Sequence, residues 1–172
     1  ISSQISSRKP FGLTTTYKGK GRPFEGSIKI YRNGGIGYAA KEEITNNLGL
    51  LKGYKVMLPR AGSGSDSFPH PILGRAFVAE PNSGCSETYI VAGQYKTKKE
   101  AENLVKYIST RFFRFLVLLM KNTQDATSRV YTFVPVQDFS EQWDDVKLQK
   151  KYKKRLKRSY LLTFSLIYGL LL

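Results

Sequence analysis

The residues that could catalyse a reaction are few, and they lie apart in the sequence. His70 is the only histidine and Cys85 the only cysteine, so a zinc cluster of histidine and cysteine ligands cannot be built from this chain. The two residues are fifteen positions apart, and "SGCSE" around the cysteine has no recognisable nucleophile context. We therefore predict that Cys85 packs in a half-buried strand and is not a nucleophile.

Phosphate-binding loops and metal-binding carboxylates are not indicated either. The stretch "AGSGS" at 61–65 resembles a phosphate loop only in composition, since both the P-loop lysine and a dinucleotide fingerprint are missing. Metal-dependent nucleases need clustered carboxylates, but the 13 acidic residues are scattered. Glu80 and Glu87 flank a predicted turn, where two acids are usually solvated or paired with a base. We predict a binding module without catalytic or metal sites.

Charge gives the strongest indication of a partner. The chain has 28 Lys and Arg against 13 Asp and Glu, a net charge of +15. Such an excess favours nucleic acid first and an anionic membrane second. Eight of the basic residues lie in "KLQKKYKKRLKR" at 147–158, so the rest of the chain retains a charge of +7.

A polar segment, "KNTQDATSR" at 121–129, directly follows the apolar "FFRFLVLLM" and precedes the apolar "VYTFVPV". A loop held between two buried elements is fixed at both ends. Its Asn, Gln and Arg side chains can pair in bidentate fashion with adenine or guanine. The alternative is an ordinary polar turn after a helix that ends at Asn122.

A DNA interface needs contacts to phosphates and contacts to base edges. The phosphate-binding candidates are basic residues on predicted loops: Lys18, Lys20, Arg22, Lys96, Lys98 and Lys99. The base-reading candidates are polar residues that interrupt buried elements: Arg60, Ser63, Ser65, Asp66, His70, Asn82, Ser83, Asn122, Gln124, Asp125, Thr127, Ser128 and Arg129.

The elements that would position these residues predict an α/β (α+β) fold with a mixed, largely antiparallel sheet. One long helix is predicted at about 97–121, because Thr97 and Glu100 make a capping box; a break is indicated near Ser109–Thr110. A short helix is predicted at 41–51. The predicted strands are 11–17, a hairpin over "SIKIYRNGGIGYA" with Asn-Gly at its turn, "YKVMLP", about 75–80 and 86–92 around a Pro-Asn-Ser-Gly turn, and "VYTFVPV".

We predict one recognition domain at 1–146 and a basic, then apolar, helical tail at 147–172. Thirteen residues follow Ser159, fewer than the roughly 20 needed to span a bilayer. We favour docking of this segment on the domain or on a partner; membrane-surface contact and an altered reading frame are the alternatives. The missing initiator Met indicates a piece of a longer chain. The absence of a signal peptide and the single cysteine predict a cytoplasmic protein.

Much of the chain resembles a known family. The stretches are "GSIKIYRNGGIGYAAKEEI", "YKVMLPRAGSG", "AEPNSGCSETYIV" and "YISTRFFRFLVLLMKNTQDATSRVYTFVPVQDFSEQWDD". They resemble the C-terminal target recognition (TaqI-type specificity) domain of adenine-specific DNA methyltransferases in type II restriction–modification systems. The resemblance covers about residues 8–150. It implies an α/β domain that grips duplex DNA from the major-groove side.

The resemblance also implies an upstream catalytic domain that binds S-adenosylmethionine and methylates N6 of a flipped adenine. The family's Asn/Asp-Pro-Pro-Tyr/Phe motif is absent from this chain. We therefore expect no catalysis and no cofactor here, with S-adenosylmethionine bound by the missing domain, whose enzyme is in some cases also an endonuclease.

The sequence thus predicts a DNA sequence-recognition domain. Its partners would be double-stranded DNA and an upstream methyltransferase domain, with no membrane contact expected. The alternative is a non-catalytic basic module that binds a protein or membrane surface through 147–172. A nuclease domain is a third hypothesis, which the lack of clustered acids disfavours.

Overall fold

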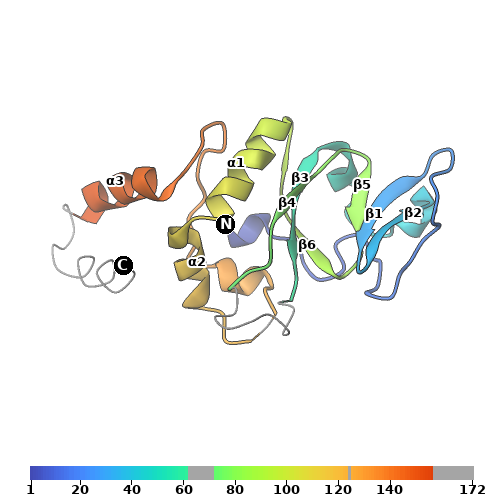
Figure 1. The fold of residues 1–172 in the computed structure, drawn as a ribbon, viewed down its shortest axis with the longest axis horizontal. Helices are drawn as coiled ribbons and strands as arrows, with labels where there is room; N and C mark the ends of the chain where they lie inside the picture. The colour runs from blue at the N-terminus through green and yellow to red at the C-terminus, as the bar shows by residue number, and fades with distance from the viewer. Residues whose placement is uncertain (62–71, 124, 157–172) are drawn as a thin grey trace.

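A computed structural model of the chain describes residues 1–61, 72–123 and 125–156 (Figure 1). The described residues contain two three-stranded sheets and three α-helices, so the predicted α+β class is confirmed. The strands are distributed over two sheets and not over one. In the described part, no helix combines the length and apolar character that a membrane crossing requires.

The central sheet has the strand order β4-β3-β6, with both pairs antiparallel. Its middle strand β3 (Tyr54–Pro59) is the predicted "YKVMLP" strand, flanked by β4 (Phe77–Ala79) and β6 (Tyr89–Tyr95). Val56 and Met57 are both fully buried, although adjacent strand residues point to opposite faces. Both faces of this sheet are therefore covered.

The second sheet has the order β2-β1-β5. Strands β1 (Ile28–Arg32) and β2 (Gly35–Ala39) form the predicted hairpin, with Arg32 opposite Gly35. Gly34 and Gly35 supply the positive φ values, 76° and 129°, which glycine adopts at low cost. Strand β5 (Ser83–Cys85) runs parallel to β1. The predicted Pro-Asn-Ser-Gly turn therefore continues into a strand.

The predicted helix at 97–121 is divided into α1 (Lys98–Ile108) and α2 (Arg111–Leu118). Thr97 and Glu100 form the predicted capping box of α1. The break falls at the indicated position because the Thr110 hydroxyl caps α2, accepting the amide of Phe113 at 3.2 Å.

The third helix, α3 (Asp145–Leu156), packs on α2. Leu148 is fully buried, and the rings of Phe112 and Tyr152 stack with centroids 4.9 Å apart. The Asp145 carboxylate also accepts the amides of Arg111 and Phe112. The helix thus begins before the predicted tail boundary at 147 and contacts the preceding residues; positions 157–172 lie outside the described residues.

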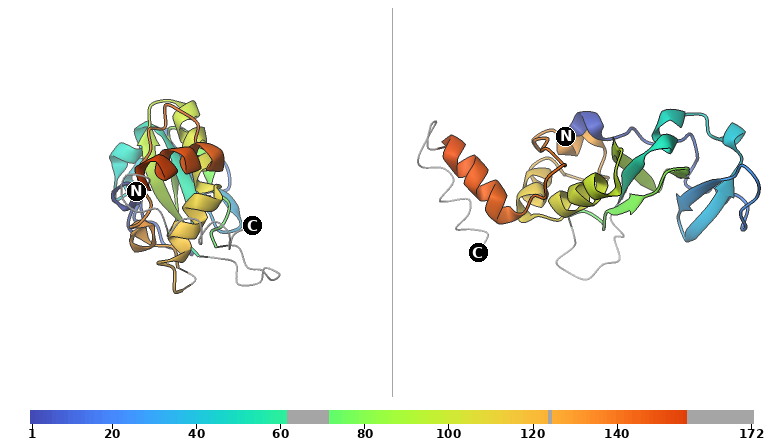
Figure 2. Two further views of the ribbon diagram at one scale, coloured as in Figure 1. Left: turned by 90° about the vertical axis from the view of Figure 1, so that its left-hand side faces the viewer. Right: turned by 90° about the horizontal axis from the view of Figure 1, so that it is seen from above.

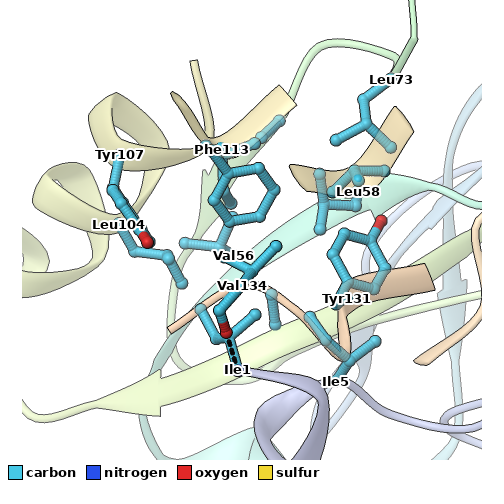
Figure 3. Close-up of a cluster of buried hydrophobic side chains, with 14 of the residues drawn as sticks. Ile1, Ile5, Val56, Leu58, Leu73, Leu104, Tyr107, Phe113, Tyr131 and Val134 are labelled. Carbon is cyan, nitrogen blue, oxygen red and sulfur yellow. Dashed lines mark hydrogen bonds between the residues drawn. The ribbon is translucent and has the colours of Figure 1, made fainter. Parts of the chain in front are cut away.

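Two hydrophobic clusters lie on opposite faces of the central sheet. One packs the sheet against α1, α2, α3 and the N-terminal segment and contains Tyr107, Phe113 and Tyr131 (Figure 3). The other packs it against the β1–β2 hairpin and contains Phe11 and Ile30. Figures 1 and 2 show this order, with helices on one side of the central sheet and the hairpin on the other.

Three predicted elements are wrong. Residues 11–17 form turns, not a strand, although Phe11 is buried. The predicted helix at 41–51 is two short 3-10 helices, Lys41–Glu43 and Leu48–Lys52, with Asn47 at φ 51° before the second. The predicted last strand is a 3-10 helix, Ser128–Tyr131, followed by a chain without strand pairing. Tyr131 and Val134 in this segment are buried although they belong to no strand.

Candidate nucleic-acid interface

The two segments predicted to read bases, which begin at Arg60 and Asn122, meet at one end of the central sheet. The amide of Ala126 donates to the carbonyl of Arg60 at 2.7 Å, and Ala61 forms an isolated antiparallel bridge with Asp125. The Arg60 Nη1 atom lies 2.7 Å from Asp125 Oδ1. A backbone hydrogen bond and an ion pair therefore connect segments that are 65 residues apart.

Local structure explains why the chain leaves the core at these positions. Strand β3 ends at Pro59, and the Arg60 amide makes a last sheet-like bond to the carbonyl of Thr88 at 2.9 Å. Helix α2 ends at Leu118, and the Lys121 amide closes the terminal turn on the carbonyl of Val117 at 2.9 Å. The polar residues after Lys121 consequently lie beside the end of β3.

Basic side chains of α2 and of the residues after it also contact the backbone at 72–73. Lys121 Nζ donates to the carbonyl of Ile72 at 2.6 Å, and Arg114 Nη2 lies 3.5 Å from the carbonyl of Leu73. Partial burial lowers the pKa of the Lys121 ammonium. The backbone at 60–61 and the backbone at 72–73 are therefore both held against α2 and the residues that follow it. Ser63, Ser65, Asp66 and His70 lie outside the described residues.

Exposure separates the described base-reading candidates into two groups. Asn122 and Arg129 are exposed, whereas Thr127 and Ser128 are half-buried. The Arg60 side chain is only 17% exposed, and its guanidinium contacts both Asp125 and the carbonyl of Glu87. Gln124 lies outside the described residues. Of the arginines Arg60 and Arg129, only Arg129 is exposed.

The sequence argument overlooked two basic residues of the N-terminal segment. Arg8 Nη2 lies 2.7 Å from Glu87 Oε1, and Lys9 Nζ lies 4.0 Å from Glu87 Oε2. Glu87 is 8% exposed, while Arg8 and Lys9 remain 57% and 48% exposed. Because Glu87 also bonds Arg60 through its carbonyl, Arg8 and Lys9 adjoin the same junction. The adjacent basic residues in "RKP" at 8–10 could have been noticed in the sequence, but only the fold shows that they lie beside Glu87.

The predicted phosphate-binding residues Lys18, Lys20 and Arg22 are exposed. Their segment, residues 18–22, runs beside the β1–β2 hairpin, across the central sheet from α1 and α2 (Figure 1). The Lys20 backbone pairs with that of Tyr38, and its ammonium lies 4.2 Å from the Phe24 ring centroid. Lys96, Lys98 and Lys99 are exposed at the start of α1. The structure does not bring these lysines to the Arg60 junction.

Asn82 and Ser83, the remaining base-reading candidates, belong to the connection between the sheets. Asn82 is exposed at φ 57°, and its amide nitrogen donates to the carbonyl of Ser27 at 3.2 Å. Ser83 is fully buried and its hydroxyl donates to the carbonyl of Glu80. The prediction that Ser83 reads bases is therefore wrong, because its hydroxyl is turned into the protein.

The residues considered for catalysis have structural partners. Cys85 is fully buried, and burial raises the pKa of its thiol, which disfavours the nucleophilic thiolate. Burial acts to raise the pKa of Glu80, but hydrogen bonds from Lys29 and Tyr31 outweigh it and lower that pKa to about 2. Glu80 and Glu87 thus have separate partners. Among the described residues, no three His, Cys, Asp or Glu side chains are placed to hold a metal ion.

A cavity of about 410 Å³ lies between the N-terminal segment and β6, and none of the junction residues Arg60, Asp125 and Ala126 lines it. Every side chain that lines it is uncharged, including Ser3, Asn47 and Gln94. It therefore has no side-chain charge to attract a phosphate or another ion.

No family model, curated protein or solved structure matches the chain. The resemblance to target recognition domains therefore stays a prediction.

Proposed function

We propose that this chain is the DNA sequence-recognition domain of an adenine-specific methyltransferase. In this proposal it positions duplex DNA for an S-adenosylmethionine-dependent catalytic domain upstream. The observation that carries the proposal is the junction of the two polar segments, where Arg60 and Asp125 pair and Ala126 bonds the backbone of Arg60. Residues chosen from the sequence for their ability to read bases thus lie side by side.

Charge around the junction supports a polyanionic partner. Six basic residues, Arg8, Lys9, Arg60, Arg114, Lys121 and Arg129, lie on the segments that meet there, against Glu87 and Asp125. Arg8 and Lys9 both lie beside Glu87, but about half of each side chain remains exposed, 57% and 48%, and can approach a phosphate. Asn122 and Arg129 are exposed and have the chemistry to pair with adenine and guanine.

The alternative, a membrane-surface module that uses 147–172, receives less support from α3. An interfacial helix needs a free apolar face. In the described part of α3, Leu148 is fully buried and Tyr152 stacks on Phe112, so these apolar side chains are already covered by the protein.

The proposal is tested by binding of this chain to a library of random duplexes, followed by titration of selected and unselected duplexes over a range of salt concentrations. We expect the logarithm of the binding constant to fall linearly with the logarithm of salt concentration, by about 0.9 for each phosphate neutralised. Selection should enrich one sequence. A flat salt plot, or a selection without enrichment, would refute the proposal.

Two variants separate the roles of the basic residues. Arg129→Ala should relax the preference at one position by about 1–3 kcal/mol, because a bidentate contact is lost. Arg8→Ala should weaken binding to all duplexes equally and reduce the salt slope by about 1. Lys52→Ala, which removes an exposed lysine on the hairpin side of the central sheet, is the matched control and should change neither property. If Arg129→Ala instead weakens binding to all duplexes equally, Arg129 contacts a phosphate and does not read a base.

A further inference from the structure

We infer that Arg60 and Asp125 act as a pair of positioning residues, which set the sequence preference by holding the residues around Asp125 against the end of β3. This inference rests on the proposed function and deepens it. It replaces the direct base contact that the sequence predicted for Arg60 with an indirect role, and it assigns Asp125 a role in specificity despite its negative charge.

The geometry gives the Arg60 guanidinium a fixed place. Its Nε donates to the carbonyl of Glu87 at 3.2 Å and its Nη1 to Asp125 Oδ1 at 2.7 Å. The bond to Glu87 holds the Arg60 side chain in place, so Nη1 offers Asp125 a hydrogen-bond donor at a fixed position. With 17% of its side chain exposed, Arg60 has little surface left for a base.

Asp125 is the more accessible partner, with 42% of its side chain exposed. It lies between exposed Asn122 and exposed Arg129 in the sequence, and the Ala126 amide next to it bonds the carbonyl of Arg60. The ion pair and the backbone bond therefore fix the same short stretch. A displaced stretch would carry Asn122 and Arg129 away from their bases, since recognition tolerates only small errors in position.

The charge of Asp125 gives the pair a distinctive signature. A carboxylate on a DNA-binding surface repels phosphates, so it lowers affinity for every duplex. Its removal should therefore raise, or leave unchanged, binding to random duplexes while it reduces the preference for the selected sequence. Loss of a direct base contact by Asp125 would give the same two changes in binding, but it would leave the Ala126 amide protected and would add to the effect of Arg60→Ala.

The test is a double-mutant cycle in this chain with Arg60→Ala, Asp125→Ala and both together. Each single variant should reduce the ratio of affinities for selected and random duplexes by about tenfold, and the double variant should reduce it no further. Asp125→Glu keeps the charge and should restore part of the ratio. Hydrogen exchange at the Ala126 amide supplies a readout without DNA, and its protection should fall in both single variants.

The outcomes distinguish this inference from the proposed function. A wild-type chain that binds no duplex selectively would refute the proposed function and this assignment together. Selective wild-type binding that Asp125→Ala leaves intact would refute only the positioning role, and so would losses that add in the double variant. Urea unfolding of each variant identifies a general loss of stability. If Asp125→Ala is unstable, Asp125→Leu, which is close to Asp in size and has no acceptor for Arg60, takes its place with the same expected changes.

Discussion

Lys55 provides the sharpest test of the fold, because this strand residue is fully buried between the two sheets. Its ammonium donates to the carbonyl of Glu80 at 2.9 Å and lies 3.4 Å from Ser83 Oγ. Desolvation lowers its pKa from 10.5 to about 8, against the opposing effects of Glu80 and Cys85. That difference corresponds to roughly 3 kcal/mol of unfavourable free energy while the lysine is charged.

The sign follows from the two pKa values of this base. Below pH 8 both states carry the proton, so the folded state bears the whole penalty. Between pH 8 and 10.5 the folded state has lost the proton and the unfolded state still binds it, so stability rises with pH. We expect Lys55→Met to raise the free energy of unfolding at pH 7 by up to about 3 kcal/mol, since replacing a buried charge by an apolar side chain is often stabilising.

Urea unfolding of the wild type and Lys55→Met at pH 7, 8, 9 and 9.5 measures this difference directly. The advantage of the variant should shrink to about 1 kcal/mol at pH 9.5, where most of the folded wild type has already lost the proton. Lys52→Met removes an exposed charge and controls for the change in net charge. A variant that is less stable than the wild type by the same amount at every pH would show that the hydrogen bonds of Lys55 outweigh its desolvation.

Three further changes test separate parts of the structure by urea unfolding. Thr97→Ala should cost about 1 kcal/mol, because it removes the hydroxyl that caps α1. The pKa of Glu80 is about 2 in the folded state against 4.5 when unperturbed, so the stabilisation by its carboxylate is lost as pH falls from 4.5 towards 2. Because the side chain is 44% exposed, we expect the free energy of unfolding to fall by only about 1 kcal/mol over this range, and not to fall in this way in Glu80→Gln. Leu148→Ala should cost about 2–5 kcal/mol if α3 belongs to the folded domain, and much less if the domain ends at 146.

The features that the sequence predicted correctly depend on neighbouring residues. The Thr97 cap, the break at Ser109–Thr110 and the turn at Asn33–Gly34 each follow from a few adjacent side chains. The prediction of a last strand was wrong because a strand also needs a distant partner. The apolar pattern of "VYTFVPV" indicates burial, and Tyr131 and Val134 are buried, but periodicity alone does not show whether a backbone partner is present.

Features that depend on distant residues were not predictable from one sequence. Strand β5 lies in a segment with the composition of a turn, and it becomes a strand because β1 pairs with it in parallel. Similarly, nothing near Arg60 in the sequence indicates that Asp125 neutralises it or that Glu87 accepts its Nε. The candidate segments were therefore predictable as polar and anchored, but the division between paired and exposed side chains was not.

Strand β3 explains why the Arg60 junction can be altered without moving the strand itself. Lys55 near one end of β3 bonds the carbonyl of Glu80, and Arg60 just beyond the other end bonds the carbonyl of Glu87. Between them β3 pairs with both β4 and β6, and its two faces are covered by separate hydrophobic clusters. Such a strand is held by many contacts that do not involve the Arg60 side chain. Arg60→Ala should consequently leave β3 in place, since the backbone of residue 60 keeps its bond to Thr88. The change removes the side-chain bonds to Asp125 and Glu87 alone.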